Sequence, residues 1–165
     1  MSKLIILGGG GYGQVAREVA LSTEKYKRVD FLDDNNPEAI GKFADYEKFV
    51  GEYDGIFIAL GNPSLRREWS EKIKKAGFRY ETLISPKSFV SPSAKIGEGV
   101  IVEPMAIVNT AAMLGEGVLI CAGACVNHNA VVGNFCQIDC GAVIGAGATV
   151  PENTKIKHNE VIYKN

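Results

Sequence analysis

The stretch ICAGACVNHNAVVGNFCQIDCGAVIGAGATV, residues 120–150, carries an aliphatic residue at every sixth position. The spacing extends in both directions, so that fourteen successive positions are all Ile, Val or Leu. They are Ile84, Val90, Ile96, Val102, Val108, Leu114, Ile120, Val126, Val132, Ile138, Ile144, Val150, Ile156 and Ile162. If about a quarter of residues were of these types, chance agreement would be on the order of one in a hundred million. The period of six therefore decides the fold of the second half of the chain.

A second stripe lies four residues after each aliphatic position, and its members are mostly small. They are Ser88, Ala94, Val100, Ala106, Ala112, Val118, Ala124, Ala130, Cys136, Ala142 and Ala148, and we expect them to face inward at tight corners. Glycines follow several aliphatic positions directly, at Gly97, Gly115, Gly133 and Gly145, where we expect turns with permissive dihedral angles. A helix would need a spacing near 3.6 and an alternating strand a spacing of 2, so neither fits.

Six residues make one short strand and a corner, and three such units close a triangular coil of eighteen residues. Each coil buries a shared aliphatic column against the next, which no coil could do by itself. This pattern resembles the hexapeptide-repeat acyltransferase superfamily. The resemblance implies left-handed winding, an exception to the usual crossover rule. We therefore expect residues 81–165 to form a left-handed parallel β-helix.

Residues 1–80 show strand–helix alternation instead of the six-residue period. The expected elements are a strand at Lys3–Leu7, a helix at Gln14–Ser22, strands at Arg28–Leu32 and Gly55–Leu60, and a helix from Pro63 towards Gly77. This order predicts a small parallel sheet of about three strands in a Rossmann-like βαβ domain.

A glycine fingerprint follows the first expected strand. Gly8, Gly10 and Gly13 match the G-x-G-x-x-G phosphate-binding pattern, and Asp33 lies 33 − 13 = 20 residues further on. Glycines let a backbone approach phosphates, a helix N-terminus offers N–H groups, and a carboxylate can hold ribose or base. The domain is expected to have only about three strands, which is half of a dinucleotide-binding fold, so we expect a mononucleotide rather than NAD. A tight turn with no ligand remains the alternative.

The chain has two histidines, and His128 is the candidate catalytic base. It occupies the third place of its hexad and should point outward, with Thr110 and Ala146 as stacked neighbours in an open groove. An imidazole that titrates near neutrality can deprotonate an amine or hydroxyl. The alternative is that His128 is an exposed surface residue without a catalytic role. His158 falls on another face, where we expect a solvated bystander. A zinc site would need three histidines, so we expect no metal.

Composition excludes several function classes. The 18 basic and 19 acidic residues leave no electrostatic footprint for nucleic acid or an anionic membrane. The apolar start is too short for a signal peptide, and no later segment could span a bilayer. Four cysteines in such a chain are expected to be reduced thiols. We therefore expect a soluble cytoplasmic protein.

Both halves together resemble the sugar O- and N-acyltransferases of the sialic acid O-acetyltransferase type, over nearly the whole chain. The motifs that carry the resemblance are Leu7–Gly13, Phe31–Asp34, Ile58–Asn62 with Arg66 following, Ile84–Pro86 and Val126–Asn129. The resemblance implies a nucleotide-sugar held by the N-terminal domain, a homotrimer, and acetyl-CoA in the groove between adjacent β-helices.

The same resemblance implies roles for individual residues. The nucleotide-sugar would contact Gly10, Gly11, Gly13, Asp33, Asp34 and Asn62. His128 would act as general base with Asn129 beside it, and Gln137, Ala146 and Gly147 would lie along acetyl-CoA.

Two positions depart from the family pattern. Asn129 stands where relatives often have Asp or Glu, and Gln137 stands where they often have a second histidine. We predict an acetyl-CoA-dependent acetyltransferase that acts on an amino or hydroxyl group of a nucleotide-linked sugar in surface-glycan synthesis. A non-catalytic nucleotide-sugar-binding or assembly module, with a decayed transferase site and a short final coil, is the alternative.

Overall fold

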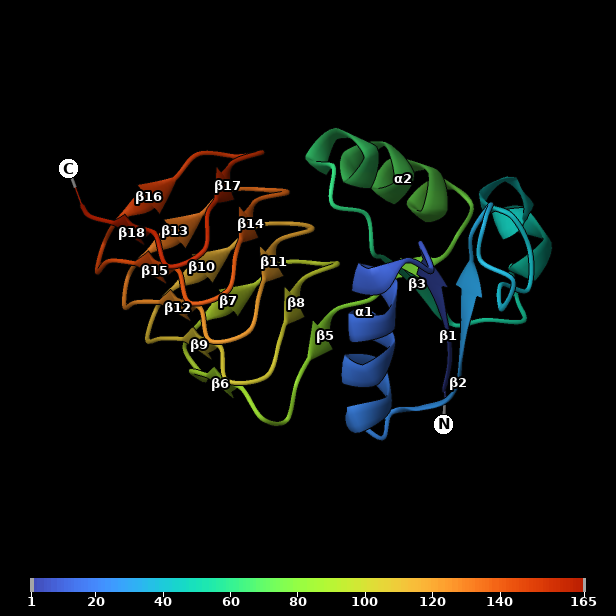
Figure 1. Ribbon diagram of the computed structural model, residues 1–165, viewed down its shortest axis with the longest axis horizontal. Coiled ribbons are helices and arrows are strands. Elements are labelled where there is room, and N and C mark those ends of the chain that lie inside the picture. The colour runs from blue at the N-terminus through green and yellow to red at the C-terminus, as the bar shows by residue number, and fades with distance from the viewer. Residues whose placement is uncertain (1, 165) are drawn as a thin grey trace. The chain divides into compact units, whose positions relative to one another are not determined.

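The computed structural model describes residues 2–164, which form two compact units that divide between Leu83 and Ile84 (Figure 1). The first unit begins with a strand–helix–strand segment that matches the predicted βαβ order. Its elements are β1 (Ser2–Leu7), α1 (Gly11–Ser22), β2 (Tyr26–Leu32), the 3-10 helix η1 (Phe43–Phe49), β3 (Gly55–Ile58), α2 (Pro63–Lys75) and β4 (Arg79–Tyr80).

The first unit is built on a parallel sheet with the strand order β2-β1-β3-β4. The central strand β1 is apolar and buried from Leu4 to Leu7. Helix α1 packs on β1 and β2, and α2 packs on β3 and β4. The order reverses direction between β1 and β3, so the loops after these two strands border the switch point where such sheets bind ligands. The fourth strand and η1 were not predicted.

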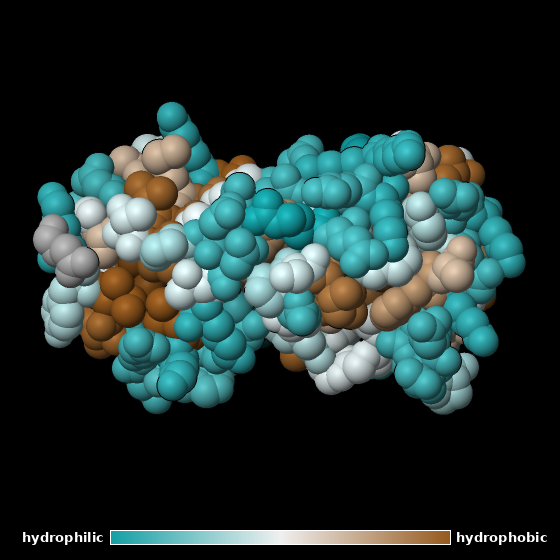
Figure 2. All heavy atoms as spheres, turned by 90° about the horizontal axis from the view of Figure 1, so that it is seen from above, coloured by the Kyte–Doolittle hydropathy of each residue, from teal (hydrophilic) through white to brown (hydrophobic). Residues whose placement is uncertain are grey.

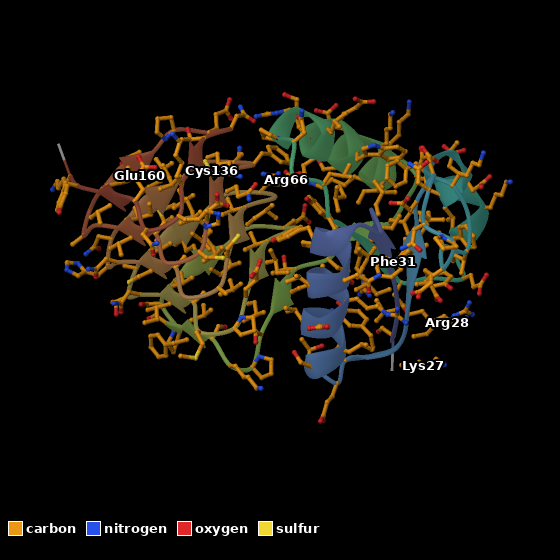
Figure 3. All side chains as sticks on the ribbon, in the orientation of Figure 1. Lys27, Arg28, Phe31, Arg66, Cys136 and Glu160 are labelled. Carbon is orange, nitrogen blue, oxygen red and sulfur yellow. The ribbon has the colours of Figure 1, made fainter. Side chains whose placement is uncertain are left out.

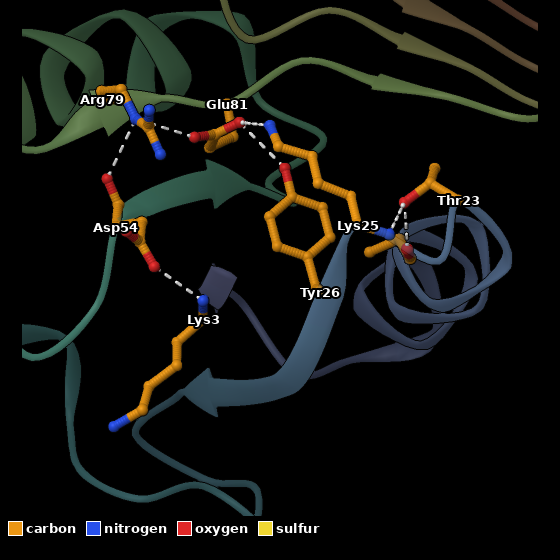
Figure 4. Close-up of polar contacts among 8 residues, drawn as sticks. Lys3, Thr23, Lys25, Tyr26, Asp54, Arg79 and Glu81 are labelled. Carbon is orange, nitrogen blue, oxygen red and sulfur yellow. Dashed lines mark hydrogen bonds and ion pairs between the residues drawn. The ribbon is translucent and has the colours of Figure 1, made fainter. Parts of the chain in front are cut away.

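A polar network ties the strands together at the opposite end of this sheet (Figure 4). Glu81 is 6% exposed and accepts hydrogen bonds from Tyr26 Oη at 2.8 Å and Lys25 Nζ at 2.6 Å. Arg79 Nε lies 3.1 Å from the other Glu81 oxygen and 3.3 Å from the Asp54 carbonyl oxygen. Burial and the neighbouring Glu81 carboxylate raise the pKa of Tyr26. The network satisfies a buried carboxylate, which would otherwise destabilise the unit.

The second unit is a left-handed parallel β-helix of two-residue strands that recur every six residues, as predicted. The second residue of each strand is one of the fourteen aliphatic positions. The strands are β5 (Leu83–Ile84), β6 (Phe89–Val90), β7 (Lys95–Ile96), β8 (Ile101–Val102), β9 (Ile107–Val108), β10 (Met113–Leu114), β11 (Leu119–Ile120), β12 (Cys125–Val126), β13 (Val131–Val132), β14 (Gln137–Ile138), β15 (Val143–Ile144), β16 (Thr149–Val150), β17 (Lys155–Ile156) and β18 (Val161–Ile162).

The strands form three parallel sheets, and each strand pairs with the strands eighteen residues before and after it. Val126, for example, lies between Val108 and Ile144. The aliphatic column and the small stripe make one buried core, in which Ala124, Ala130 and Cys136 are fully buried. Ile84 departs from the pattern, because this first position is exposed.

The corners use glycine differently from the prediction. Every sixth residue from Gly99 to Asn159 has a positive φ, including six that are not glycine: Met105, Ala111, Asn129, Phe135, Asn153 and Asn159. The predicted glycines after the aliphatic positions are absent from this set. They are required instead because stacked coils approach closely: a Cβ at Gly97 would lie 2.7 Å from Gly115 O, and one at Gly133 would lie 2.6 Å from Glu152 N.

The outward positions of the β-helix expose several large apolar side chains. Phe89, Met105, Ile107, Met113 and Val161 are each between 39% and 73% exposed. Figure 2 shows hydrophobic surface on the β-helix part of the face in view, interrupted by hydrophilic groups. Among residues 2–164, no helix has the length and apolar character needed to cross a bilayer.

Candidate functional site

The loop from Gly8 to Gly13 joins β1 to α1 and is held by close backbone packing. A Cβ at Gly13 would collide with the carbonyl oxygen of Gly8, so only glycine fits there. Gly13 is buried, and it serves the packing of the helix start against the loop. Gly8 has φ +103° and lies against the Ala59 carbonyl of the loop after β3. These two glycines therefore shape the loop instead of facing a ligand.

Gly10 and Gly11 form the exposed part of the same loop. A Cβ at either position would meet no atom within 4 Å, so open space lies above this backbone. Helix α1 begins at Gly11 with Gly10 as its N-cap, and its first turn contains no acidic residue. The N–H groups of a first helical turn favour an anion. Open space and a helix start make Gly10 and Gly11 fit a phosphate group.

Asp33 holds the glycine loop from the neighbouring strand. Its carboxylate accepts hydrogen bonds from the backbone N–H groups of Gly9, Asn35 and Asn36, each at 2.8 Å. These donors, first that of Gly9, hold the pKa of Asp33 below its usual value. Asn36 completes the link by donating from Nδ2 to the Gly9 carbonyl at 2.7 Å. Asp33 is thus engaged in positioning the loop, and the role of Asn36 in this link was not predicted.

Asp34 and Asn62 follow β2 and β3, and both are exposed. Asp34 accepts from the Phe43 N–H at 3.2 Å, which ties it to η1. Asn62 is the N-cap of α2, and its Oδ1 accepts from the Leu65 N–H at 3.1 Å, as capping residues do. Each residue keeps polar atoms directed to solvent while it fixes a local turn.

Arg66 is a fully buried charged residue on α2 (Figure 3). One guanidinium nitrogen donates to the carbonyl oxygens of Leu60 at 2.9 Å and Gly61 at 3.0 Å. The loop after β3 is therefore fixed from within. In the sequence, only the position of Arg66 shortly after Gly61, Asn62 and Pro63 indicated that it fixes this loop.

His128 lies on the corner between β12 and β13 with its side chain exposed, as predicted. Its N–H donates to Asn127 Oδ1 at 2.7 Å, and its carbonyl accepts from the Gly147 N–H at 3.0 Å. Asn129 has φ +57°, and its Nδ2 lies 2.9 Å from His128 Nδ1. The backbone N–H and carbonyl of His128 are thus both bonded, and the imidazole ring is exposed together with Asn129.

Ala146 and Gly147 lie on the next coil, directly along the stack from His128 and Asn129. Gly147 lines a cavity of about 590 Å³ together with Thr149 and the segment 161–164. Another groove, of about 440 Å³, runs along the sheet that contains β13; Met113, Val131 and Asn134 are among its lining residues. The β-helix therefore offers concave surface of ligand size close to the His128 corner.

Gln137 is not brought near His128 within one chain. It belongs to β14, in a different sheet from β12 and β13, and donates to Asp139 at 2.7 Å. Asp139 is buried and also lies 3.2 Å from Lys155 Nζ and 3.8 Å from His158 Nε2. His158 is therefore exposed, as expected, and its ring lies beside the Asp139 carboxylate.

The cysteines are all free thiols. Cys136 is an inward residue, where a thiol serves as a small apolar side chain. Its Sγ, a weak donor, also donates to the Pro151 carbonyl oxygen at 2.9 Å. Burial raises the pKa of the Cys121 thiol, so that it is a poor nucleophile. Within residues 2–164, no group of three His, Cys, Asp or Glu side chains is arranged to hold a metal ion.

Comparison with known proteins supplies a family for this arrangement. Residues 3–73 match the family model of the PglD N-terminal domain. A curated relative, UDP-N-acetylbacillosamine N-acetyltransferase of Bacillus subtilis, is 30% identical over 118 residues, which are 62% of this chain. The match covers 51% of that relative, so the chain spans about half the length of the curated protein.

Solved structures extend the likeness to the whole chain. The acetyltransferase domain of PglB from Neisseria gonorrhoeae, in complex with acetyl coenzyme A, is 31% identical with a TM-score of 0.94, over 99% of this chain and 82% of that one. Perosamine N-acetyltransferase from Caulobacter crescentus, in complex with CoA and GDP-perosamine, shares the fold at 21% identity and a TM-score of 0.85, over 100% of this chain and 90% of that one. The chain therefore belongs to the family that includes the acetyltransferase domain of PglB.

Proposed function

We propose that this protein is an acetyl-CoA-dependent acetyltransferase that acts on the amino group of a nucleotide-linked sugar in surface-glycan synthesis. The observation that carries the proposal is the exposed His128 ring, presented from a corner whose backbone is fully engaged. Two of the relatives above are N-acetyltransferases, which favours an amine over a hydroxyl acceptor. Within the family, we propose the type that the sequence resembles, the sugar O- and N-acyltransferases of the sialic acid O-acetyltransferase type, and a cytoplasmic location.

The N-terminal unit would bind the nucleotide-sugar at the crevice between β1 and β3. Gly10 and Gly11 would accept the phosphates over their open backbone, since a side chain there would occupy that space. Asp34 and Asn62 would offer their remaining polar atoms to ribose or sugar. Gly13 and Asp33 would act indirectly, by holding the loop in shape.

In the transfer step, the sugar amine nitrogen would bond to the acetyl carbonyl carbon, and the bond from that carbon to the CoA sulfur would break. His128 Nε2 would take the proton lost by the amine and return it to the departing thiolate. This role requires a proton on Nδ1. Rotation of the Asn129 amide by half a turn would place Oδ1 where Nδ2 now lies, 2.9 Å from Nδ1, as the acceptor of that proton.

Acetyl-CoA would lie along the corner that carries His128, Ala146 and Gly147, where the side chains are small or absent. We further propose a homotrimer, because the β-helix exposes Phe89, Ile107 and Met113 on its outward positions. Gln137 would then contact acetyl-CoA only in a groove between subunits, since it lies on a different sheet from His128 within one chain.

The test measures CoA release from acetyl-CoA with a panel of nucleotide-linked amino sugars. We expect His128→Ala to lower kcat about a hundred- to ten-thousand-fold, the usual effect of losing a general base. His158→Ala is the matched control and should keep wild-type activity. Nucleotide binding with no CoA release above the His128→Ala background would contradict the enzyme proposal and favour the non-catalytic binding module.

A further inference from the structure

Lys164 lies in the same column of the β-helix as His128. Strand β12 pairs with β15, and β15 pairs with β18, so that His128, Ala146 and Lys164 follow one another along the stack at intervals of eighteen residues. Paired strands lie about 4.8 Å apart, which places the backbone of Lys164 about 10 Å from that of His128. The proposed function gives Lys164 no role.

The side chain of Lys164 extends back along the stack towards His128. A Cβ at Gly147 would lie 3.3 Å from Lys164 Cδ and 3.6 Å from Lys164 Nζ, so the lysine side chain lies across the bare backbone of Gly147. The Gly147 N–H in turn donates to the His128 carbonyl at 3.0 Å. The Lys164 amine is therefore about one coil from the His128 corner, whereas its own backbone is two coils away.

The Lys164 amine is exposed and faces a cavity. Within the part of the chain that the structure describes, no carboxylate pairs with it, whereas Lys155 of the same coil lies 3.2 Å from Asp139. The cavity of about 590 Å³ is lined by Gly147 and Lys164, and otherwise by Thr149, Val161, Ile162 and Tyr163. A primary amine is thus presented to a space of ligand size beside the proposed base.

We propose that Lys164 is a site of self-acetylation, at which the protein modifies its own side chain from acetyl-CoA. The inference rests on the proposed function, which places the thioester along the His128 corner. The uncharged Lys164 Nζ would bond to the acetyl carbonyl carbon, and the bond from that carbon to the CoA sulfur would break. His128 would take the proton lost by the amine and return it to the departing thiolate, so that CoA leaves as the thiol.

This reaction uses the same chemistry as the proposed transfer to a sugar. The amine of lysine and the amine of an amino sugar are the same functional group, so a thioester and a base placed for one can serve the other. Acetylation would make the Lys164 side chain neutral. The cavity would thereby lose the one charged group among the described residues that line it.

Lys157 is the matched control within the same protein. It is exposed and belongs to the same coil as Lys164, but it lies in the column of Asp139, at a different corner from His128. We would incubate the full chain with acetyl-CoA in the absence of sugar, and follow the acetylation of each lysine by peptide mass spectrometry. Lys164 should be acetylated at least about tenfold faster than Lys157, because its amine is held beside the donor.

A second donor and three variants separate a placed reaction from general lysine reactivity. Acetyl phosphate, which lacks the CoA moiety, should modify Lys164 and Lys157 at similar rates. His128→Ala and His128→Gln should each lower the rate at Lys164 to that at Lys157, because the amine loses its base. Lys164→Arg should remove this modification and leave the rate at Lys157 unchanged. Thermal denaturation of each variant checks that the fold is kept.

Equal rates at Lys164 and Lys157 with acetyl-CoA, or an unchanged rate at Lys164 in both His128 variants, would overturn the proposal. Its failure is distinguishable from that of the proposed function. If amino sugars are acetylated but Lys164 reacts no faster than Lys157, the inference falls alone. If Lys164 is acetylated in a His128-dependent way but no sugar is, the inference stands and the sugar acceptor is wrong. If neither is acetylated, both proposals fall.

Discussion

The glycine loop and the His128 corner are both tight turns, but they use backbone and side chain in opposite ways. In the loop, the Asp33 and Asn36 side chains hold the chain in place, and the backbone of Gly10 and Gly11 is left open. At the corner, the carbonyl of His128 is bonded to the next coil, and the ring is exposed with Asn129 beside its Nδ1. A loop that holds phosphate needs bare N–H groups, whereas proton transfer needs a titratable ring.

This difference separates structural from chemical roles among residues of one motif. Substitutions that disturb the supports should lower stability first, and substitutions at the open groups should lower binding or turnover first. The predictions below test that separation, beginning with the largest expected change.

Gly13→Ala should destabilise the first unit by about 3–5 kcal/mol, because its Cβ would collide with the Gly8 carbonyl. Gly11→Ala should cost no stability, since nothing lies within 4 Å of its Cβ, but should weaken nucleotide binding at least tenfold. Chemical denaturation and calorimetric titration of both variants measure the two effects. An equal loss of stability in both variants would contradict the proposal that Gly13 serves packing while the backbone of Gly11 is open to a ligand.

Asp33→Asn should cost about 1–3 kcal/mol at pH 7, because three backbone donors lose a charged acceptor. The pKa of Asp33 is lower in the folded than in the unfolded protein. The stabilising effect of its carboxylate is therefore full above the unfolded pKa of about 3.9, and is lost as the pH falls through the native pKa. The stabilities of wild type and variant should therefore converge once the pH has fallen below the native pKa of Asp33. Denaturation curves from pH 7 to pH 2 measure this. A stability difference that stays constant over this pH range would contradict the proposal that the Asp33 carboxylate holds the glycine loop.

Asn62→Ala should lower stability by about 1 kcal/mol, the usual cost of losing an N-cap. Asn62→Asp keeps an acceptor for the Leu65 N–H and should retain the stability of the wild type. The same two variants probe ligand contact. If Asn62→Asp changes the Kd of the nucleotide-sugar while its stability stays that of the wild type, the side-chain amide of Asn62 contacts the ligand. Thermal denaturation and titration of both variants provide the measurement.

Asn129→Asp should produce the smallest change and affect only chemistry. A carboxylate next to His128 Nδ1 would stabilise the imidazolium, so the acidic limb of the kcat/KM profile should move to higher pH by about half a unit, as for an exposed pair. Stability should not change, because Asp tolerates the positive φ almost as well as Asn. Asn153→Asp, at an equivalent corner, is the control; if it moves the limb equally, general charge is the cause.

Most of the fold could be predicted because its signals are local and repeated. The positions from Ile84 to Ile162 specify every strand of the β-helix, since each coil repeats the same burial requirement. The first unit was predicted less completely. Strand β4 has two residues and η1 has no apolar period, and both depend on tertiary contacts that leave little trace in the sequence.

The candidate site was harder to predict than the fold. The positions of His128, Ala146 and Gly147 follow from counting eighteen residues per coil. The structural role of Gly13 and Asp33 did not follow, because a fingerprint gives residue types but not which of them touch each other. Gln137 was assigned to acetyl-CoA through the family resemblance, and the sequence did not show that within one chain its amide is bonded to Asp139.

The positive φ at every sixth residue has a consequence for how this chain tolerates mutation. Ala111, Met105 and Phe135 hold a backbone shape that costs a side-chain-bearing residue roughly 1–2 kcal/mol. Each of these corners is therefore a reserve of stability that a change to glycine or asparagine could release. A β-helix that gained stability in this way could accept costly substitutions around the His128 corner without unfolding, so that corner could change in sequence on the same scaffold.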